Sequence, residues 1–337
     1  MEKRKKVETM RDSRNFRRLC RRAWEELGAT CRIARVTCVW DAGVTLLAKV
    51  LIQIMNRTGC RETEARRKLL KAKHRVMLRY LQRILPDTAM PEAAEGRAAD
   101  VIWLCWWQGE QAMPPVVRAC TESVKRHAAN RRVILITEEN YPQYADIPRW
   151  LTEKYRAGEI SPTHFSDILR LHLLAEHGGI WLDASIYCAG TPEGWDLPLW
   201  TIRRPGYGHI SPAAGEFATY GMGCGEDKRF VFGLLRAMLE SYWAVEKKLT
   251  DYLVLDYLMV LAQKQHPALA SAFGNVPAGE PDCDQLCSVL GQPFDESLWQ
   301  QLRKNTCLFK LTWKRQFPRE KEGKATFYGM LLEGELG

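Results

Sequence analysis

An aspartate and a serine follow one of the most apolar strand-like runs of the chain. The run 180–182 (Ile-Trp-Leu) is followed by Asp183 and, two residues later, by Ser185. An acid at the carboxyl end of a buried parallel strand occupies the place where open α/β sheets bind ligands. Side chains two residues apart can face the same side of an extended segment. Such oxygen ligands suit Mg²⁺ or Mn²⁺ bridging to a diphosphate, whereas the alternative is a strand-ending aspartate that caps a turn.

A second candidate pair, Asp167 and Arg170, lies on a predicted helix that is apolar nearly all round and therefore buried. Buried charges are costly unless they are paired or meet a ligand. The two residues are three positions apart and share a helix face, so an ion pair within the helix is the structural alternative. The guanidinium fork of Arg170 also suits bidentate binding of a phosphate.

Two aspartates and two lysines complete the set of candidates. Asp251 and Asp256 are candidates for work near an acceptor, but five residues on a helix span about 500°, so they do not share a face. Asp256 stands in an apolar run and is expected to be the more buried, whereas Asp251 could simply begin a helix. Lys310 and Lys314 are candidates to close over a diphosphate, and the alternative is two solvated lysines beside a strand.

The 12 tryptophans exceed ordinary usage and suggest platforms for sugar rings. Trp106, Trp107 and Trp181 lie in or next to short apolar runs. Aromatic residues in short strands more often belong to the core, and that is the interpretation we favour here.

The elements that must position these groups alternate between strand and helix patterns. Ser161 is expected to cap the helix that carries Asp167, and Gly178 to end it. The predicted strands are 101–107, 133–136 and 180–182, and the predicted helices are 115–127, 148–156, 161–177, 229–247 and 251–265. This order predicts an α/β domain on a largely parallel sheet.

The N-terminal third differs in charge and in pattern. Residues 1–100 hold 24 Lys/Arg and 12 Asp/Glu, a net of +12, whereas residues 101–337 hold 25 and 28, a net of −3. Residues 1–85 are predicted to be helical, and 86–96 contain two prolines and read as a linker. We therefore predict a basic helical extension over 1–90 and a separate domain over 98–337.

Composition excludes several classes of protein. The chain has 337 residues, of which 46% are hydrophobic and 26% charged, so disorder and collagen-like repeats are excluded for the chain as a whole. The 11 cysteines show no framework spacing, which favours reduced thiols in a cytoplasmic protein. We find no secretory signal pattern, and the most apolar stretch, 33–55, carries too many charges for a spanning helix.

The residues around Asp183 carry a family resemblance. The segment 165–185 (FSDILRLHLLAEHGGIWLDAS) resembles the core signature of the capsular polysaccharide synthesis family of glycosyltransferases, which is related to glycosyltransferases with a DXD-containing sugar-binding region. Further segments match in kind and order: 102–109, 122–125, 139–141, 146–148, 249–258, 293–295 and 310–314. The resemblance covers about residues 100–330 and leaves the first hundred outside.

The resemblance implies a GT-A type, Rossmann-like, mostly parallel sheet with flanking helices that binds a nucleotide-sugar, usually with Mn²⁺ or Mg²⁺. Asp183 matches the first acid of the DXD motif, and Ser185 stands where the second acid would be. Because a hydroxyl is a weaker ligand than a carboxylate, a metal requirement is less firmly predicted. Donor-site positions of the family fall on Asp167 and Arg170, and positions near the nucleotide base on Trp103 and Gln108.

The predicted function is transfer of a hexose from a nucleotide-sugar, a UDP-sugar in the first instance, to a growing surface glycan such as capsular polysaccharide or lipopolysaccharide. By kinship with the family, retention of anomeric configuration is expected. The acceptor would be a glycan or a lipid-linked glycan.

The competing interpretation is a non-catalytic protein whose basic N-terminus binds nucleic acid or an anionic membrane. No nucleic-acid module is recognisable in residues 1–100. Amphipathic basic helices lie at membrane interfaces, so residues 1–85 are expected to place the protein at the inner face of the cell membrane. A solvated basic cap or a self-association bundle remains the alternative.

Overall fold

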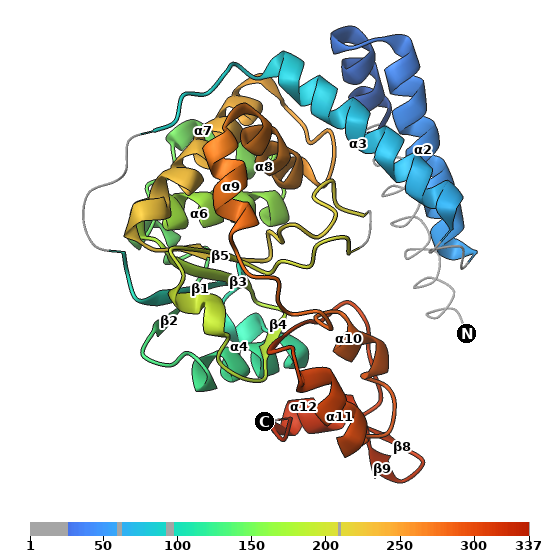
Figure 1. The fold of residues 1–337 in the computed structure, drawn as a ribbon, viewed down its shortest axis with the longest axis vertical. Coiled ribbons are helices and arrows are strands. Elements are labelled where there is room, and N and C mark those ends of the chain that lie inside the picture. The colour runs from blue at the N-terminus through green and yellow to red at the C-terminus, as the bar shows by residue number, and fades with distance from the viewer. Residues whose placement is uncertain (1–25, 59–62, 92–97, 208–209, 337) are drawn as a thin grey trace, which may run out of the picture.

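A five-stranded sheet in the order β2-β1-β3-β6-β5 forms the centre of the protein (Figure 1). The structure, a computed structural model, describes residues 26–58, 63–91, 98–207 and 210–336. The strands are β1 (Val101–Cys105), β2 (Arg132–Ile136), β3 (Gly179–Asp183), β5 (Leu199–Thr201) and β6 (Gly221–Cys224). β1 is parallel to β2 and β3, whereas β6 is antiparallel to β3 and β5. The predicted α/β class is confirmed, with an antiparallel edge beside the parallel strands.

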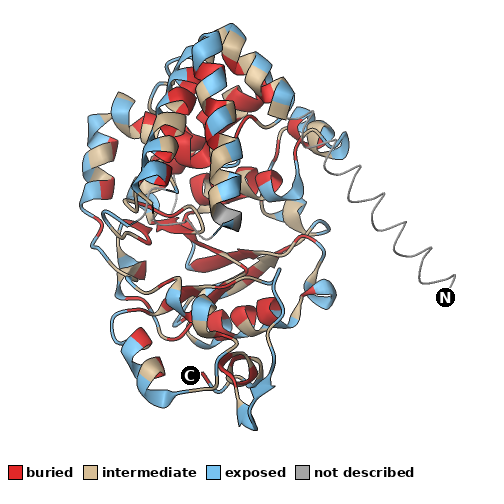
Figure 2. Ribbon diagram, turned by 90° about the vertical axis from the view of Figure 1, so that its right-hand side faces the viewer, coloured by how far each residue is buried: buried red, intermediate tan, exposed pale blue. Residues whose placement is uncertain are grey.

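Alternate residues of the strands face two different cores, as the period of two in a strand requires. Val101 and Trp103 belong to the cluster that includes residues of α6 (Pro162–His177), α7 (Arg229–Val245) and α8 (Val254–Gln265). Ile102 and Leu104 pack on the opposite face with residues of α4 (Pro115–Arg126) and β4 (Ile186–Cys188). Buried residues accordingly fill the space on both sides of the sheet (Figure 2).

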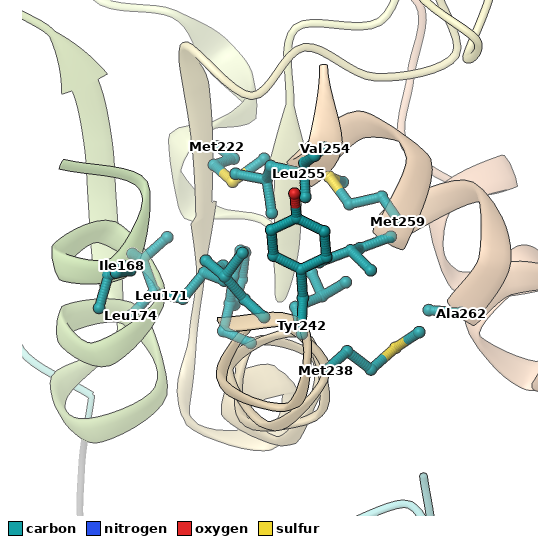
Figure 3. Packing of buried hydrophobic residues seen from close by; sticks show 14 of the residues in the cluster. Ile168, Leu171, Leu174, Met222, Met238, Tyr242, Val254, Leu255, Met259 and Ala262 are labelled. Atoms are coloured by element: carbon teal, nitrogen blue, oxygen red, sulfur yellow. The ribbon is translucent and has the colours of Figure 1, made fainter. Parts of the chain in front are cut away.

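The helix before β3 begins and ends where its sequence predicts. The Ser161 side chain accepts a hydrogen bond from a backbone N–H of the first turn, and Pro162 opens the helix. Gly178 ends α6 with φ 67°, and Gly179 follows with φ 85°. A Cβ at Gly179 would lie 2.7 Å from the Val101 carbonyl oxygen, so the chain turns from α6 into the sheet through a space that only glycine fits. Figure 3 shows Tyr242 of α7 between Ile168 and Leu171 of α6 and Met259 of α8.

The C-terminal part returns to the edge of the site. Its elements are α9 (Pro267–Gly274), α10 (Gln285–Val289), α11 (Glu296–Arg303), β7 (Leu308–Lys310), β8 (Glu320–Lys321), β9 (Lys324–Ala325) and α12 (Phe327–Glu333). The first half of the chain contains a further helix, α5 (Arg149–Arg156). β7 pairs antiparallel with β4, so that Lys310 lies opposite Ile186. This pairing places a residue from near the end of the chain beside the segment that follows β3.

The N-terminal helices pack on the α7–α8 side of the domain. Residues 26–36 are helical, and α2 (Val39–Arg57) and α3 (Glu64–Ile84) follow. Met77 and Leu81 of α3 are fully buried in the cluster that contains α6, α7 and α8, and His74 Nδ1 lies 2.8 Å from the Tyr257 hydroxyl. α3 therefore shares a core with the α/β domain. The predicted boundary near residue 90 stays a prediction, and the helix expected over residues 14–24 lies outside the described residues.

A membrane-spanning helix is not found among the described residues, because none of their helices is both long and apolar enough to cross a bilayer.

We expect the shared core to make α3 essential for the stability of the whole domain. Leu81→Ala should lower the free energy of unfolding by about 2–5 kcal/mol, because it removes a fully buried side chain. Leu47→Ala on α2 is the matched control, since Leu47 is 56% exposed, and it should change stability by less than about 0.5 kcal/mol. Urea unfolding followed by tryptophan fluorescence measures both. An unchanged transition in Leu81→Ala would show that the helices do not contribute to the core of the domain.

Candidate active site

A cavity of about 720 Å³ opens at the carboxyl ends of β1 and β3. Cys105 and Gln108 line it from the end of β1, and Asp183 and Ser185 from the end of β3. α6 contributes Asp167 and Arg170, the first turn of α8 contributes Asp256, and the segment between β5 and β6 contributes residues from Ile202 to Tyr220. This is the place where open α/β sheets bind ligands, because loops after parallel strands meet there.

Asp183 is held by two cations and an indole. Its Oδ1 accepts from Arg170 Nη2 at 3.2 Å and from Trp181 Nε1 at 3.1 Å, and its Oδ2 lies 2.6 Å from Lys310 Nζ. Burial favours the neutral acid, but the charges of Lys310 and Arg170 outweigh it and hold the pKa of Asp183 below its ordinary value. Asp183 is therefore ionised in neutral solution.

Arg170 is the most buried charge at the cavity, with its side chain 4% exposed. Its Nη2 lies 3.2 Å from both Asp167 Oδ1 and Asp183 Oδ1, and its guanidinium carbon lies 4.9 Å from the ring centre of Trp181. Its Nε and Nη1 have no hydrogen-bond partner among the described residues. A guanidinium carries five donor hydrogens, so the surrounding protein groups leave part of the donor capacity of Arg170 unused.

Asp256 lies in the first turn of α8 and accepts a hydrogen bond from the Ser211 hydroxyl at 2.6 Å. Burial raises its pKa to about 6, and the nearby Asp167 adds to this increase, whereas the Ser211 hydrogen bond and Arg170 oppose it. Asp256 is buried, with 9% of the residue exposed, but Asp251 is 5% exposed, so the prediction that Asp256 would be the more buried of the two is wrong. A carboxyl with a pKa of about 6 can take up or release a proton near neutral pH.

The structure brings most of the predicted site residues together. Six of them line the cavity, namely Gln108, Asp167, Arg170, Asp183, Ser185 and Asp256. Lys310 reaches the same group through its ion pair with Asp183. The spacing in sequence between α6, β3, α8 and β7 does not reveal this convergence, which depends on the way the segments pack.

Three predicted residues lie away from the cavity. Trp103 is buried below the site and donates to the Gly178 carbonyl at 3.0 Å, so it packs in the core. Asp251 forms an ion pair with Lys73 of α3 at 2.8 Å and accepts from the Leu253 N–H at 3.1 Å. Lys314 is exposed, with its Nζ 5.8 Å from the ring centre of Trp313, and does not line the cavity.

Several residues that line the cavity were not among the predicted site residues. Trp106, which we expected in the core, lies edge-to-face with Trp313 at 5.5 Å between ring centres, and both line the cavity. At another part of the wall, Arg204 contacts Asp284 at 2.9 Å and the Tyr220 hydroxyl at 2.8 Å. The Trp at 313 stands within a segment of the family resemblance, but the Arg204–Asp284 contact joins positions 80 residues apart and has no local signal.

The residues around Asp183 offer few ligands for a metal ion. Among the described residues, no group of three or more His, Cys, Asp or Glu side chains could hold a metal ion. Asp183 and Ser185 offer one carboxylate and one hydroxyl. Mg²⁺ typically takes one or two protein carboxylates and completes its coordination with water and substrate phosphates. The residues therefore fit a metal that arrives with a diphosphate rather than a metal caged by the protein.

The fold and the cavity together define an α/β protein that binds its ligand at the carboxyl ends of parallel strands. The family model described as capsular polysaccharide synthesis protein matches residues 57–331. The chain belongs to this family, and the predicted class of enzyme, a glycosyltransferase, is confirmed at that level. The match begins at residue 57 and so includes α3, which corrects the expectation that the first hundred residues lie outside the family.

Comparison with solved structures finds a protein described as "PaToxG Glycosyltransferase". It is 14% identical, with a TM-score of 0.37, and the match covers 63% of this chain and 84% of that one. No curated protein matches the chain at a significant level.

The raised pKa of Asp256 predicts a pH-dependent stability difference. Because the folded pKa, about 6, is above the ordinary value of 3.8, ionisation of Asp256 disfavours the folded state as the pH rises through this window. Asp256→Asn removes this effect. Relative to the native protein, the variant should therefore be more stable at pH 7 than at pH 4, with a difference of about 2 kcal/mol.

Denaturant unfolding at the two pH values provides the measurement, with Asp227→Asn, at an exposed aspartate, as the control. If both variants follow the native pH profile equally, Asp256 does not have the environment that the structure shows.

Proposed function

We propose that the chain transfers a hexose from a nucleotide-sugar to a growing surface glycan such as capsular polysaccharide or lipopolysaccharide. UDP-sugars are the first donors to test. The observation that carries this proposal is the buried Arg170 at the cavity, with two donor groups that no described residue satisfies. A diphosphate supplies the oxygen acceptors that such an arginine lacks.

The leaving group of this reaction is a nucleoside diphosphate, on which negative charge develops. Arg170 and Lys310 lie on either side of Asp183, so both cations are positioned before a donor arrives. Preorganised charges of this kind stabilise the developing charge most effectively in a cavity from which water is excluded. The Lys310 side chain is 25% exposed, so its ammonium group can leave the ion pair with Asp183 and bind a phosphate oxygen without disturbing the core.

A divalent metal is part of the proposal. Asp183 and Ser185 would hold Mn²⁺ or Mg²⁺ together with the donor diphosphate, where the ion would neutralise charge on the leaving group. Asp183 suits this role because its pKa is lowered and it is ionised when the metal binds.

The remaining lining residues suggest how the other substrate groups are bound. Gln108 and Trp106 are proposed to contact the nucleotide base, and the Trp106–Trp313 pair offers ring faces for a sugar. Asp256, with its pKa of about 6, is proposed to act near the acceptor hydroxyl. Retention of anomeric configuration, a glycan or lipid-linked glycan acceptor and a cytoplasmic location at the membrane surface complete the proposal.

Nucleotide release tests the proposed transfer. We expect the native chain to release nucleoside diphosphate from one member of a panel of UDP- and GDP-sugars in the presence of Mn²⁺ and a glycan acceptor. Asp183→Asn and Lys310→Ala should each lower kcat by about 10²-fold or more, because the first removes the carboxylate proposed to hold the metal and the second removes a cation proposed to act on the leaving group.

Lys324→Ala, at an exposed lysine on β9, is the matched control and should keep native turnover. Native turnover in both site variants, with the control equally active, would contradict the assignment of the site. No release with any donor would contradict the proposed reaction.

The Mn²⁺ dependence of turnover tests the role of Ser185. Ser185→Asp adds a carboxylate at this position and should lower the Mn²⁺ concentration for half-maximal turnover by about tenfold, whereas Ser185→Ala should raise it. Titration of EDTA-treated protein with Mn²⁺ provides the measurement. Identical titration curves for the two variants would show that residue 185 does not contact the metal.

A further inference from the structure

The outward face of α2 is apolar. Five large side chains on it are strongly exposed: Val39 at 80%, Trp40 at 80%, Leu47 at 56%, Val50 at 47% and Ile54 at 50%. At about 100° per residue they fall within one arc of the helix of roughly 100°. The opposite face of α2 is buried against its neighbours. Such a gathering of exposed apolar side chains on one helix marks a surface that binds a partner.

The outward face of α3 is basic. Arginine or lysine recurs every fourth residue along it, and all of these side chains belong to exposed residues, namely Arg67, Lys71, Arg75, Arg79 and Arg83. Residues spaced by four lie on one side of a helix. None of Arg67, Lys71 and Arg75 forms an ion pair with any residue that the structure describes. Within 26–58 and 63–91 there are 12 Lys/Arg and 4 Asp/Glu, a net charge of +8.

The two helices contact one another. Arg79 of α3 contacts Asp41 at 2.8 Å, on the buried side of α2. Arg83 donates to the carbonyls of Val36 and Thr37, just before α2 begins. We call the exposed apolar residues of α2 and the exposed basic residues of α3 the α2–α3 surface; it is formed by the two helices that stand apart from the sheet in Figure 1.

We propose that the α2–α3 surface docks the protein on an anionic lipid bilayer. A bilayer offers apolar chains to Trp40 and Leu47 and anionic headgroups to the basic residues of α3. Tryptophan suits the boundary between the apolar chains and the headgroups, because its ring is apolar and its N–H can reach the headgroups. A second copy of the chain fits less well, since pairing through this surface would bring two regions of net charge +8 together.

The cavity lies on the domain side of α3. Lys73 of α3 pairs with Asp251 at 2.8 Å, and the next residue, Tyr252, is 68% exposed and lines the cavity. Lys73 is about 160° around the helix from Arg75, so the rim of the cavity and the exposed basic residues lie on opposite sides of α3. A protein docked through the α2–α3 surface would therefore keep the cavity rim free of the bilayer. This inference assigns a surface to the membrane location proposed above and does not depend on sugar transfer.

Co-sedimentation of the full chain with vesicles tests the proposal. We expect binding to phosphatidylcholine vesicles that contain phosphatidylglycerol, much weaker binding to phosphatidylcholine alone, and a decrease with added salt. Trp40→Ser combined with Leu47→Ser should weaken binding at least about tenfold, because two apolar anchors are lost. Lys71→Glu combined with Arg75→Glu should weaken it by a similar factor, and only for the anionic vesicles.

The matched controls are Trp150→Ser and Arg149→Glu on α5, which change an exposed tryptophan and an exposed arginine outside the surface and should bind as the native chain does. Equal binding by all variants would overturn the proposal. It would also be overturned if the native chain is a dimer in sedimentation velocity, the Trp40/Leu47 variant is a monomer, and neither binds vesicles. Nucleotide release with a soluble acceptor should be native in the surface variants, which separates failure of docking from failure of the proposed reaction.

Discussion

The buried guanidinium of Arg170 is the charge on which the rest of the site depends. A charge that is 4% exposed is tolerated only where acids surround it, and here Asp167 and Asp183 lie at equal distance from one of its nitrogens. The aromatic face of Trp181 covers another side of the group. Two of its nitrogens have no hydrogen-bond partner among the described residues, and the proposed diphosphate binding depends on them.

The glycine pair between α6 and β3 sets the distance between the two acids. Gly178 and Gly179 both have positive φ, and side chains there would collide with the Cys224 and Val101 carbonyls. The chain can therefore pass directly from a buried helix to a central strand. Asp167 and Asp183 are 16 positions apart along the chain, but this tight turn folds them onto the same arginine. Lys310 joins them because β7 pairs with β4, immediately after the same strand.

The N-terminal helices belong to the fold as well as to the surface. Tyr80 of α3 donates to Glu246, and Arg32 pairs with the same carboxylate at 2.9 Å. Lys73 forms an ion pair with Asp251. Arg32 and Lys73 of the N-terminal helices thus hold the segment between α7 and α8 in place. The position of Asp256 at the start of α8 therefore depends partly on residues from outside the α/β alternation. Part of the positive charge is structural, and the remainder faces outward from α3.

The sequence by itself determined the local features. The cap at Ser161, the glycine end of α6, the buried strand and the acid behind it all follow from rules that act over a few residues, and the structure confirms them. It also determined the family, because ordered motifs specify a family without coordinates. Tertiary packing alone decided which candidates meet. Trp103 lies in the core, Asp251 pairs with Lys73 of α3, and Trp106 lines the cavity. The physical reason is that the burial and the partners of a side chain depend on segments distant in sequence, and no local pattern records which of them will pack beside it.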